Sequence, residues 1–394
     1  MESTGDRNRW AMLALLFVAR VGLGFQFQTM GSVGDPVAQD LHLSFAEIGT
    51  LIGLFMIPGP LALLAGVASR YMSDRMLVAG GLLLLALGGA SAAIADGFGL
   101  LAVGRLLCGT GFVISTIFFT KMVVDWFAGR ELATAMAIVV ASWPFGIAMG
   151  QVGHSWLAIV HGWRAPFVAA SIYCLAAALL VLIAYRPPPT TTAAPASPST
   201  MLTAREWSLT LIASVVWAAF NAAYIVYLSF APRVLEASGI GALAAASTIS
   251  LASWVVIFSG AVCGHIADRT GRSDLILAIC LCCGMASLAL LQHAAWAGAV
   301  SLAFGMLGMA PAGLIMALTG AAMAPQKRAL GMGIFFGVYF LSSAPAPAIA
   351  GWLYDRTGDA FTPILFAIAL FALTLAANFA FRFTQRALPQ PPAG

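Results

Sequence analysis

One arginine, Arg20, lies inside the first long apolar stretch of the chain, LALLFVARVGLGFQFQTMGSV. The stretch begins near Trp10, so a helix places Arg20 roughly 15 Å along it, near the middle of a hydrocarbon core about 30 Å thick. A cation at that depth costs at least about 2.5–3.5 kcal/mol. A guanidinium pairs well with carboxylates and other oxyanions, so we expect Arg20 to anchor an anionic substrate. The alternative is a structural arginine that donates to helix carbonyls or to polar groups of a neighbouring span.

Other polar side chains within apolar spans could complete such a site. At about 100° per residue, Gln28 lies near the face of Arg20 and Gln26 lies well away from it, so Gln28 is the expected second ligand. The second half of the chain offers hydroxyls, amides and aromatic rings instead of cations, and packing is the alternative role for each ring. These candidates are Asn221, Tyr224, Tyr227, Tyr339 and Ser342, with Ser343 beside them. Pro345 and Pro347 follow directly and should interrupt that helix, and ligand sites within membranes commonly lie near such interruptions.

Two further cations belong to the fourth span. Arg105 lies about 9 Å from its outer end, and a direct functional role and structural hydrogen bonding are about equally expected. Lys121 lies four residues before Asp125 at the other end, where a local ion pair is the expected arrangement.

Acidic residues are confined to tails, loops and span ends. Only Asp35, Glu47 and the histidines could titrate near a span, and we place all of them near the membrane faces. Exchange or uniport of an anion therefore fits better than a buried carboxylate relay, unless an arginine or the substrate carries the proton. The six cysteines lack metal-ligand spacing, so no metal or other cofactor is expected. No nucleophile and base share one depth, so we do not expect an enzyme.

The composition explains where these residues must lie. The chain has 394 residues, 61% of them hydrophobic and only 9% charged, whereas a soluble domain carries about 25% charged residues. We predict an all-α membrane protein with twelve spans, near 10–33, 45–68, 76–95, 100–124, 131–152, 164–185, 207–230, 242–266, 274–293, 296–322, 329–352 and 361–382. A Pro-, Thr- and Ala-rich linker over 187–206 separates a six-helix bundle at 1–186 from another at 207–394.

The distribution of basic residues predicts the orientation. With the N-terminus inside, fourteen basic residues fall on the cytoplasmic side and three outside, which favours cytoplasmic termini by the positive-inside rule. The cations are spread over short loops rather than gathered, so no nucleic-acid partner is expected. Three pairs share an offset of 198 positions and indicate an internal duplication: Gly66 and Gly264, Arg130 and Arg328, Gly153 and Gly351.

The loop after the eighth span reads GHIADRTGR, from Gly264 to Arg272, and resembles the signature loop of the major facilitator superfamily. Gly264 would permit close helix packing, Gly271 a tight turn, and Asp268 pairing with a cation or a helix N-terminus. Arg269 and Arg272 complete the motif. The first-half equivalent departs from it, since Arg70 and Ser73 replace the acid and the second glycine, and Asp74 could substitute in part.

Further motifs agree with this resemblance: Arg105 with Gly109 and Gly111, Gly162-Trp163-Arg164, and GWLYDRTG from Gly351. The stretches FVARVGLGFQFQ, EIGTLIGLFMIPG and DWFAGRELATAM look most like bacterial anion permeases of the nitrate and cyanate or nitroimidazole sort.

The resemblance implies two pseudo-symmetric six-helix halves that rock about a central cavity, with Arg105 linked to gating or proton handling, and Asp74, Asp125 and the signature loop to conformational change. We expect a monomer in the bacterial inner membrane that moves a small organic or inorganic anion. A proton-coupled drug or metabolite exporter and a membrane sensor that binds without transporting remain the alternatives.

Overall fold

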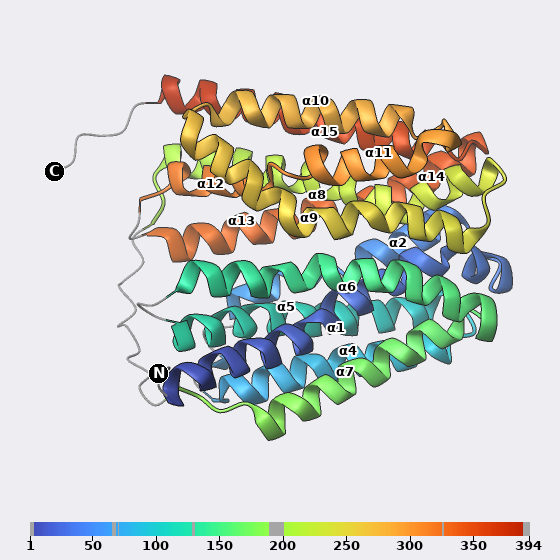
Figure 1. The fold of residues 1–394 in the computed structure, drawn as a ribbon, viewed down its shortest axis with the longest axis horizontal. Helices are drawn as coiled ribbons and strands as arrows, with labels where there is room; N and C mark the ends of the chain where they lie inside the picture. The colour runs from blue at the N-terminus through green and yellow to red at the C-terminus, as the bar shows by residue number, and fades with distance from the viewer. Residues whose placement is uncertain are drawn as a thin grey trace. The chain divides into compact units, whose positions relative to one another are not determined.

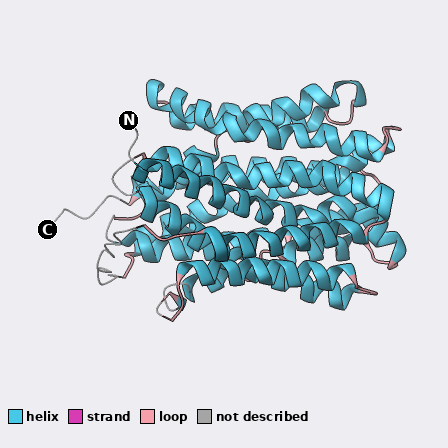
Figure 2. Ribbon diagram, turned by 60° about the horizontal axis from the view of Figure 1, so that its bottom comes forward, coloured by secondary structure: helices cyan, strands magenta, loops and turns pink. Residues whose placement is uncertain are grey.

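The computed structural model describes residues 4–64, 68–69, 71–127, 131–188, 201–324 and 327–388. Every regular element in these ranges is helical (Figure 2), and twelve of the helical segments are long and apolar enough to cross a membrane. Their positions agree with the twelve predicted spans, although several helices extend further than the apolar stretches do. Chain contacts divide the molecule into two compact units, Met1–Ala194 and Pro195–Gly394. The expected linker lies mostly outside the described residues, and the predicted domain boundaries stay a prediction.

The N-terminal unit contains one helix per span, with one exception. Its elements are α1 (Thr4–Asp40), α2 (Phe45–Leu54), η1 (Gly59–Leu64), α4 (Asp74–Ala93), α5 (Phe98–Phe127), α6 (Leu132–His161) and α7 (Arg164–Ala184). The second span is divided into α2 and η1, because Pro58 and Pro60 cannot continue the helical hydrogen-bond pattern. Ser44 begins α2 with a capping box closed by Glu47.

Small residues bring the helices of this unit into close contact. Gly24 of α1 faces the carbonyl of Trp143 in α6, and a Cβ on Gly24 would also meet the nitrogen of Ile147 at 3.1 Å. The ribbon of α1 therefore runs obliquely past α6 and α7 (Figure 1). Gly81 and Gly88 make equally close approaches from α4 to α5. These contacts fix which side chains of α1 can reach α6.

The C-terminal unit has more interrupted helices. It consists of α8 (Ala204–Ala237), α9 (Ala242–Thr270), α10 (Ser273–Leu290), η2 (Ala294–Trp296), α11 (Ala297–Ala303), η3 (Phe304–Gly308), α12 (Ala312–Ala322), α13 (Arg328–Ser343), α14 (Ala346–Thr357) and α15 (Thr362–Ala387). The expected interruption at Pro345 and Pro347 is confirmed, since α13 ends at Ser343 and α14 begins at Ala346. The tenth span is divided by a π-helical turn, η3, and by a bend before Ala312, which the sequence did not predict.

Candidate functional site

Arg20 is buried, with 7% of its surface exposed, and one edge of its guanidinium is fixed by α6. Its Nη1 donates to the carbonyl of Val139 at 2.7 Å and to the hydroxyl of Ser142 at 2.9 Å. Pro144 lies inside α6 and has no N–H for the carbonyl of Val140, which also lies 3.4 Å from Nη1. The proline thus explains why backbone acceptors are available at this depth.

The other edge of the same guanidinium is free. Nε is buried without a hydrogen-bond partner, and neither Nε nor Nη2 of Arg20 donates to any group in the described residues. None of the described carboxylates is within ion-pair distance of Arg20. The Nε–Nη2 edge presents parallel donors in the geometry that a carboxylate accepts with both oxygens. Arg20 therefore matches the structural alternative on one edge and remains open to an anion on the other.

Gln28 points to α6, the same helix that Arg20 contacts, as the helical spacing predicted. Its amide donates to the side chain of Gln151 and to the hydroxyl of Ser32 at 3.3 Å. Gln26 instead donates to the sulfur of Cys108 in α5 at 3.2 Å. Gln28 is therefore already bonded within the unit, and its role as a ligand stays a prediction.

All three guanidinium nitrogens of Arg105 donate hydrogen bonds, mostly to backbone carbonyls and in one case to the hydroxyl of Thr29. Its Nε donates to the carbonyl of Leu51 at 3.0 Å, and Nη2 donates to that of Phe27 at 3.3 Å. Leu51 lies in the last turn of α2, where helix carbonyls lack N–H partners and attract positive charge. The guanidinium also lies over the ring of Phe55 at 4.8 Å. This geometry supports structural hydrogen bonding, and the gating role stays a prediction.

In the C-terminal unit, two of the expected tyrosine ligands are engaged with α9. The hydroxyl of Tyr224 lies 2.6 Å from that of Ser253, and the hydroxyl of Tyr227 donates to the carbonyl of Ile249 at 3.3 Å. Tyr227 is completely buried and packs on Phe304 with ring centroids 4.4 Å apart. Both phenols therefore act as packing residues in this state.

Two of the remaining candidates of this unit, Asn221 and Tyr339, contact Trp217. Asn221 donates to the carbonyl of Trp217 at 2.8 Å, and the Trp217 ring lies 6.1 Å from that of Tyr339. No hydrogen bond is recorded for the hydroxyl of Tyr339 or for that of the exposed Ser342 within the described ranges. Ser342 lines a mainly apolar hollow of about 130 Å³ between α8, the α13–α14 interruption and α15. Among the predicted ligands of this unit, Tyr339 and Ser342 are thus the two whose hydroxyls make no hydrogen bond within the described residues.

The residues expected to govern conformational change lie at helix ends. Lys121 pairs with Asp125 at 3.1 Å, as predicted, and also with Asp74, so both acids share one cation. Gly271 ends α9 in the left-handed conformation, with φ of 64°, and confirms the expected tight turn. Asp268, Arg269 and Arg272 are exposed, and no contact of Asp268 is recorded within the described ranges.

The expectation for Gly264 is wrong. A Cβ on Gly264 would meet no heavy atom of the described residues within 4 Å, so this glycine mediates no close packing among them. Gly66 and Arg70 of the first-half loop, and Arg130, lie outside the described residues.

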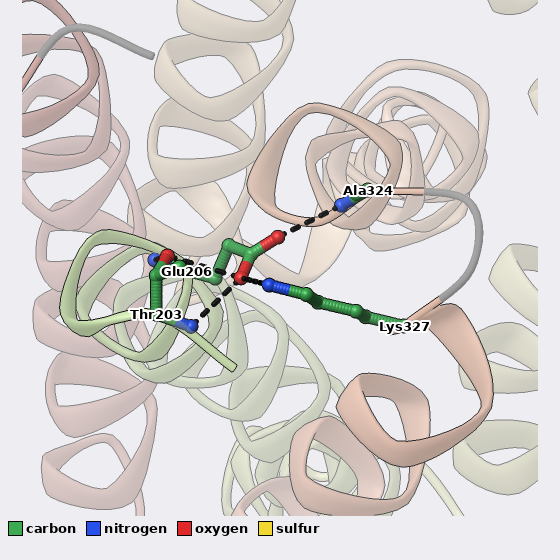
Figure 3. A network of polar contacts seen from close by, with 4 residues as sticks. All are labelled: Thr203, Glu206, Ala324 and Lys327. Carbon is green, nitrogen blue, oxygen red and sulfur yellow. Dashed lines mark hydrogen bonds and ion pairs between the residues drawn. The ribbon is translucent and has the colours of Figure 1, made fainter. Parts of the chain in front are cut away.

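Two ion pairs that the sequence did not predict join the first helix of each unit to the segment before its fifth span. In the N-terminal unit, Arg9 pairs with Glu131 at 2.7 Å. In the C-terminal unit, Lys327 pairs with Glu206 at 2.7 Å, and the same carboxylate accepts from the backbone of Thr203 and Ala324 (Figure 3). Thr203 and Glu206 form a capping box, Thr-x-x-Glu, which can be recognised in the sequence. No sequence pattern predicts that Lys327 is the partner of Glu206.

His154 corrects the expectation that all histidines lie near the faces. It lies in α6, about 10 Å along the helix from its end at His161, and none of its surface is exposed. Both ring nitrogens are buried without a hydrogen-bond partner. Its ring packs on Phe25 of α1, with centroids 4.2 Å apart. The apolar residues around the whole of this helix concealed which face is internal.

The fold and these sites define a multi-pass helical membrane protein with two units of six spans. A family model described as "Major Facilitator Superfamily" matches residues 13–347, and the chain belongs to this family of transporters. The predicted superfamily membership is thereby confirmed. The closer resemblance to nitrate or cyanate permeases stays a prediction.

Several known proteins are similar to this chain in sequence, over shares of their length that range from 38% to 93%. A hexuronate transporter of Bacillus subtilis (strain 168) is 24% identical over 93% of both chains. A chloramphenicol resistance protein of Streptomyces lividans is 30% identical over 68% of this chain and 69% of its own, and a gallate transporter of Pseudomonas putida is 27% identical over 43% and 38%. The inward-facing structure of a bacterial homologue of the lysosomal transporter Spinster matches with a TM-score of 0.76 at 15% identity, covering both chains completely, and supports the fold alone.

Proposed function

We propose that this transporter moves a small organic anion bearing a carboxylate by alternating access, with Arg20 as the anion anchor. The free Nε–Nη2 edge of Arg20 carries the proposal, because it is a buried cationic fork without an anionic partner. Burial strengthens a charge-assisted hydrogen bond relative to water. The opposite edge is fixed by Val139 and Ser142, so the fork is oriented before the anion binds.

The relatives support this substrate class. Hexuronates and gallate, named for two of the relatives, are small hydroxylated carboxylates. Of the predicted ligands in the C-terminal unit, Tyr339 and Ser342 have hydroxyls that make no hydrogen bond in the described residues. Gln28, Asn221, Tyr224 and Tyr227 would have to exchange their present partners to bind such a molecule.

A drug exporter is the second candidate, and the similarity to the chloramphenicol resistance protein favours it. An uncharged drug gains little from a guanidinium fork. Dependence on Arg20 therefore separates the two functions.

The test is uptake and counterflow in proteoliposomes with labelled glucuronate, gallate and chloramphenicol. Arg20→Gln should lower anion transport by roughly 10–100-fold, because a hydrogen bond to a charged group contributes about 1.5–3 kcal/mol. Arg20→Lys should retain part of the activity, because it keeps the charge and loses the fork. Arg164→Gln, at an exposed cation paired with Asp40, is the matched control. Anion transport unchanged in Arg20→Gln would contradict the anchor, and chloramphenicol transport alone would favour the exporter.

A further inference from the structure

His154 is an unusual side chain for the interior of the N-terminal unit. A neutral imidazole has one donor and one acceptor, and here both are buried without a partner. Leaving such groups unpaired is unfavourable, and an apolar residue of similar size would avoid the penalty. The imidazole is therefore best explained by chemistry in another state of the transport cycle.

The space around the ring limits what could bind there. A Cβ on Gly150 would lie 3.1 Å from the His154 ring, and Phe25 covers it at 4.2 Å between centroids. Phe25 in turn packs on Tyr173 of α7, whose hydroxyl donates to the carbonyl of Val18. An organic anion does not fit among these contacts. A proton can bind to a ring nitrogen of His154 without additional space. A small separation of α1 from α6 at Phe25 would give it access to the ring.

Polar groups that could accept from a protonated ring lie next to it. Gln151 is on the same face of α6, one helical turn away, and bonds to Gln28. Ser32 donates to the carbonyl of Gly150 at 3.4 Å. The ring of Phe25 could also stabilise an imidazolium through its π-face.

The charges on the surrounding helices would make proton binding at His154 depend on the binding of an anion. The titratable and charged groups with described side chains on the helices packed against His154 are Arg9, Arg20, Asp35 and Asp40 on α1, Arg105, Cys108, Lys121 and Asp125 on α5, His161 on α6, and Arg164, Tyr173 and Cys174 on α7. Two of them, Arg20 and Arg105, are buried cations without a carboxylate partner. Protonation of His154 would add a third buried cation without a carboxylate partner to this unit, and the like charges oppose it until an anion neutralises one of them.

We propose that His154 is a proton-binding site, and that it takes up a proton cooperatively with the anion bound at Arg20. Ser142, which holds Arg20, and His154 lie on the same helix, roughly 18 Å apart along its axis. By linkage, an anion that favours the protonated ring is itself bound more tightly by the protonated protein. The protein then moves a proton and an anion in the same direction. This inference rests on the proposed anion substrate and adds the coupling ion.

The experiment compares two transport modes in the full-length protein. Proteoliposomes holding wild type, His154→Gln or His161→Gln are given labelled glucuronate, either with an inward gradient of one pH unit or in counterflow without a gradient. His161 is the matched control, because it is an exposed histidine at the end of the same helix. Proton release or uptake by the purified protein on addition of glucuronate is measured separately in a weakly buffered solution.

We expect the His154→Gln variant to differ from wild type in gradient-driven accumulation but not in counterflow. Wild type and His161→Gln should accumulate glucuronate roughly tenfold under the gradient, as one proton per anion allows, and should take up close to one proton per anion bound. His154→Gln should lose accumulation and proton uptake but retain counterflow.

Three results would overturn the proposal: gradient-driven accumulation by His154→Gln, glucuronate binding by wild type without proton uptake, or proton uptake that persists in His154→Gln. If wild type neither binds nor transports any anion offered, the proposed function fails, and this inference fails with it. Anion transport without proton uptake would remove this inference alone.

Discussion

The two units place their buried charges at different depths. In the N-terminal unit, Arg20 and Arg105 lie within the spans, and both donate to backbone carbonyls. In the C-terminal unit, the buried charged side chains of the described residues are Glu206 and Arg233, at opposite ends of α8. Rings and hydroxyls occupy its interior. Among the described residues, the buried cations within spans therefore belong to the N-terminal unit, and the interior of the C-terminal unit offers neutral polar groups.

The ion pairs at the first helices extend the comparison. Arg9–Glu131 and Glu206–Lys327 join equivalent positions, but the acid and the base are exchanged. The side chain of Glu131 is 52% exposed, whereas that of Glu206 is 9% exposed. The two contacts thus lie at corresponding places in the two units but exchange the acid and the base, and the two pairs should differ in strength.

The largest predicted effect tests the interior cation of the N-terminal unit. Arg105→Leu should destabilise the protein by roughly 3–5 kcal/mol, because several buried carbonyls of α1 and α2 lose a charged donor. The measurement is the thermal unfolding temperature in detergent, with the exposed Arg164→Leu as the control. Equal, small shifts for both variants would mean that the carbonyls of Leu51 and Phe27 do not depend on Arg105.

An intermediate effect is expected at the end of α8. Glu206→Gln should cost about 1.5–3 kcal/mol, since Lys327 and the N–H of Ala324 lose a charged acceptor. Glu131→Gln should cost about 0–1 kcal/mol, as for an exposed pair. Thermal unfolding of the two variants side by side measures the difference, and a larger shift for Glu131→Gln would break the comparison.

The smallest effect concerns glycines. Gly24→Ala should cost roughly 1–3 kcal/mol, because its Cβ would collide with the α6 backbone. Gly264→Ala meets open space and should change stability by no more than about 0.5–1 kcal/mol, in the stabilising direction if the helical preference of alanine acts alone. Thermal unfolding and counterflow rates check both. A neutral Gly24→Ala would show that α1 and α6 can separate without loss.

Patterns formed by residues close together in the sequence were sufficient to predict much of this fold. Span length and hydropathy predicted the twelve helical segments, prolines predicted the end of α13, and a four-residue spacing predicted the pair of Lys121 and Asp125. Each of these depends on residues close together in the chain.

The partners of the buried polar groups could not be predicted in this way. The acceptors of Arg20 and Arg105 are mostly backbone carbonyls, which every residue carries and no sequence pattern marks. The burial of His154 depends on how α6 packs against α1, and a helix that is apolar all round gives no preferred face. The division of the tenth span had a visible signal in Gly305, Gly308 and Pro311, which we interpreted as part of one continuous helix.

The hydrogen bonds of the two interior arginines also bear on how the chain enters the membrane. All the acceptors of Arg105 lie in α1 and α2, which are synthesised earlier, so α5 can satisfy its cation on arrival. The acceptors of Arg20 lie about 120 residues later, in α6. During synthesis, α1 therefore enters the bilayer with an uncompensated charge, at a cost of about 2.5–3.5 kcal/mol. The hydrogen bonds of Arg20 can form only after α6 has been inserted. The first helix to be synthesised is therefore among the last of its unit to reach its final position.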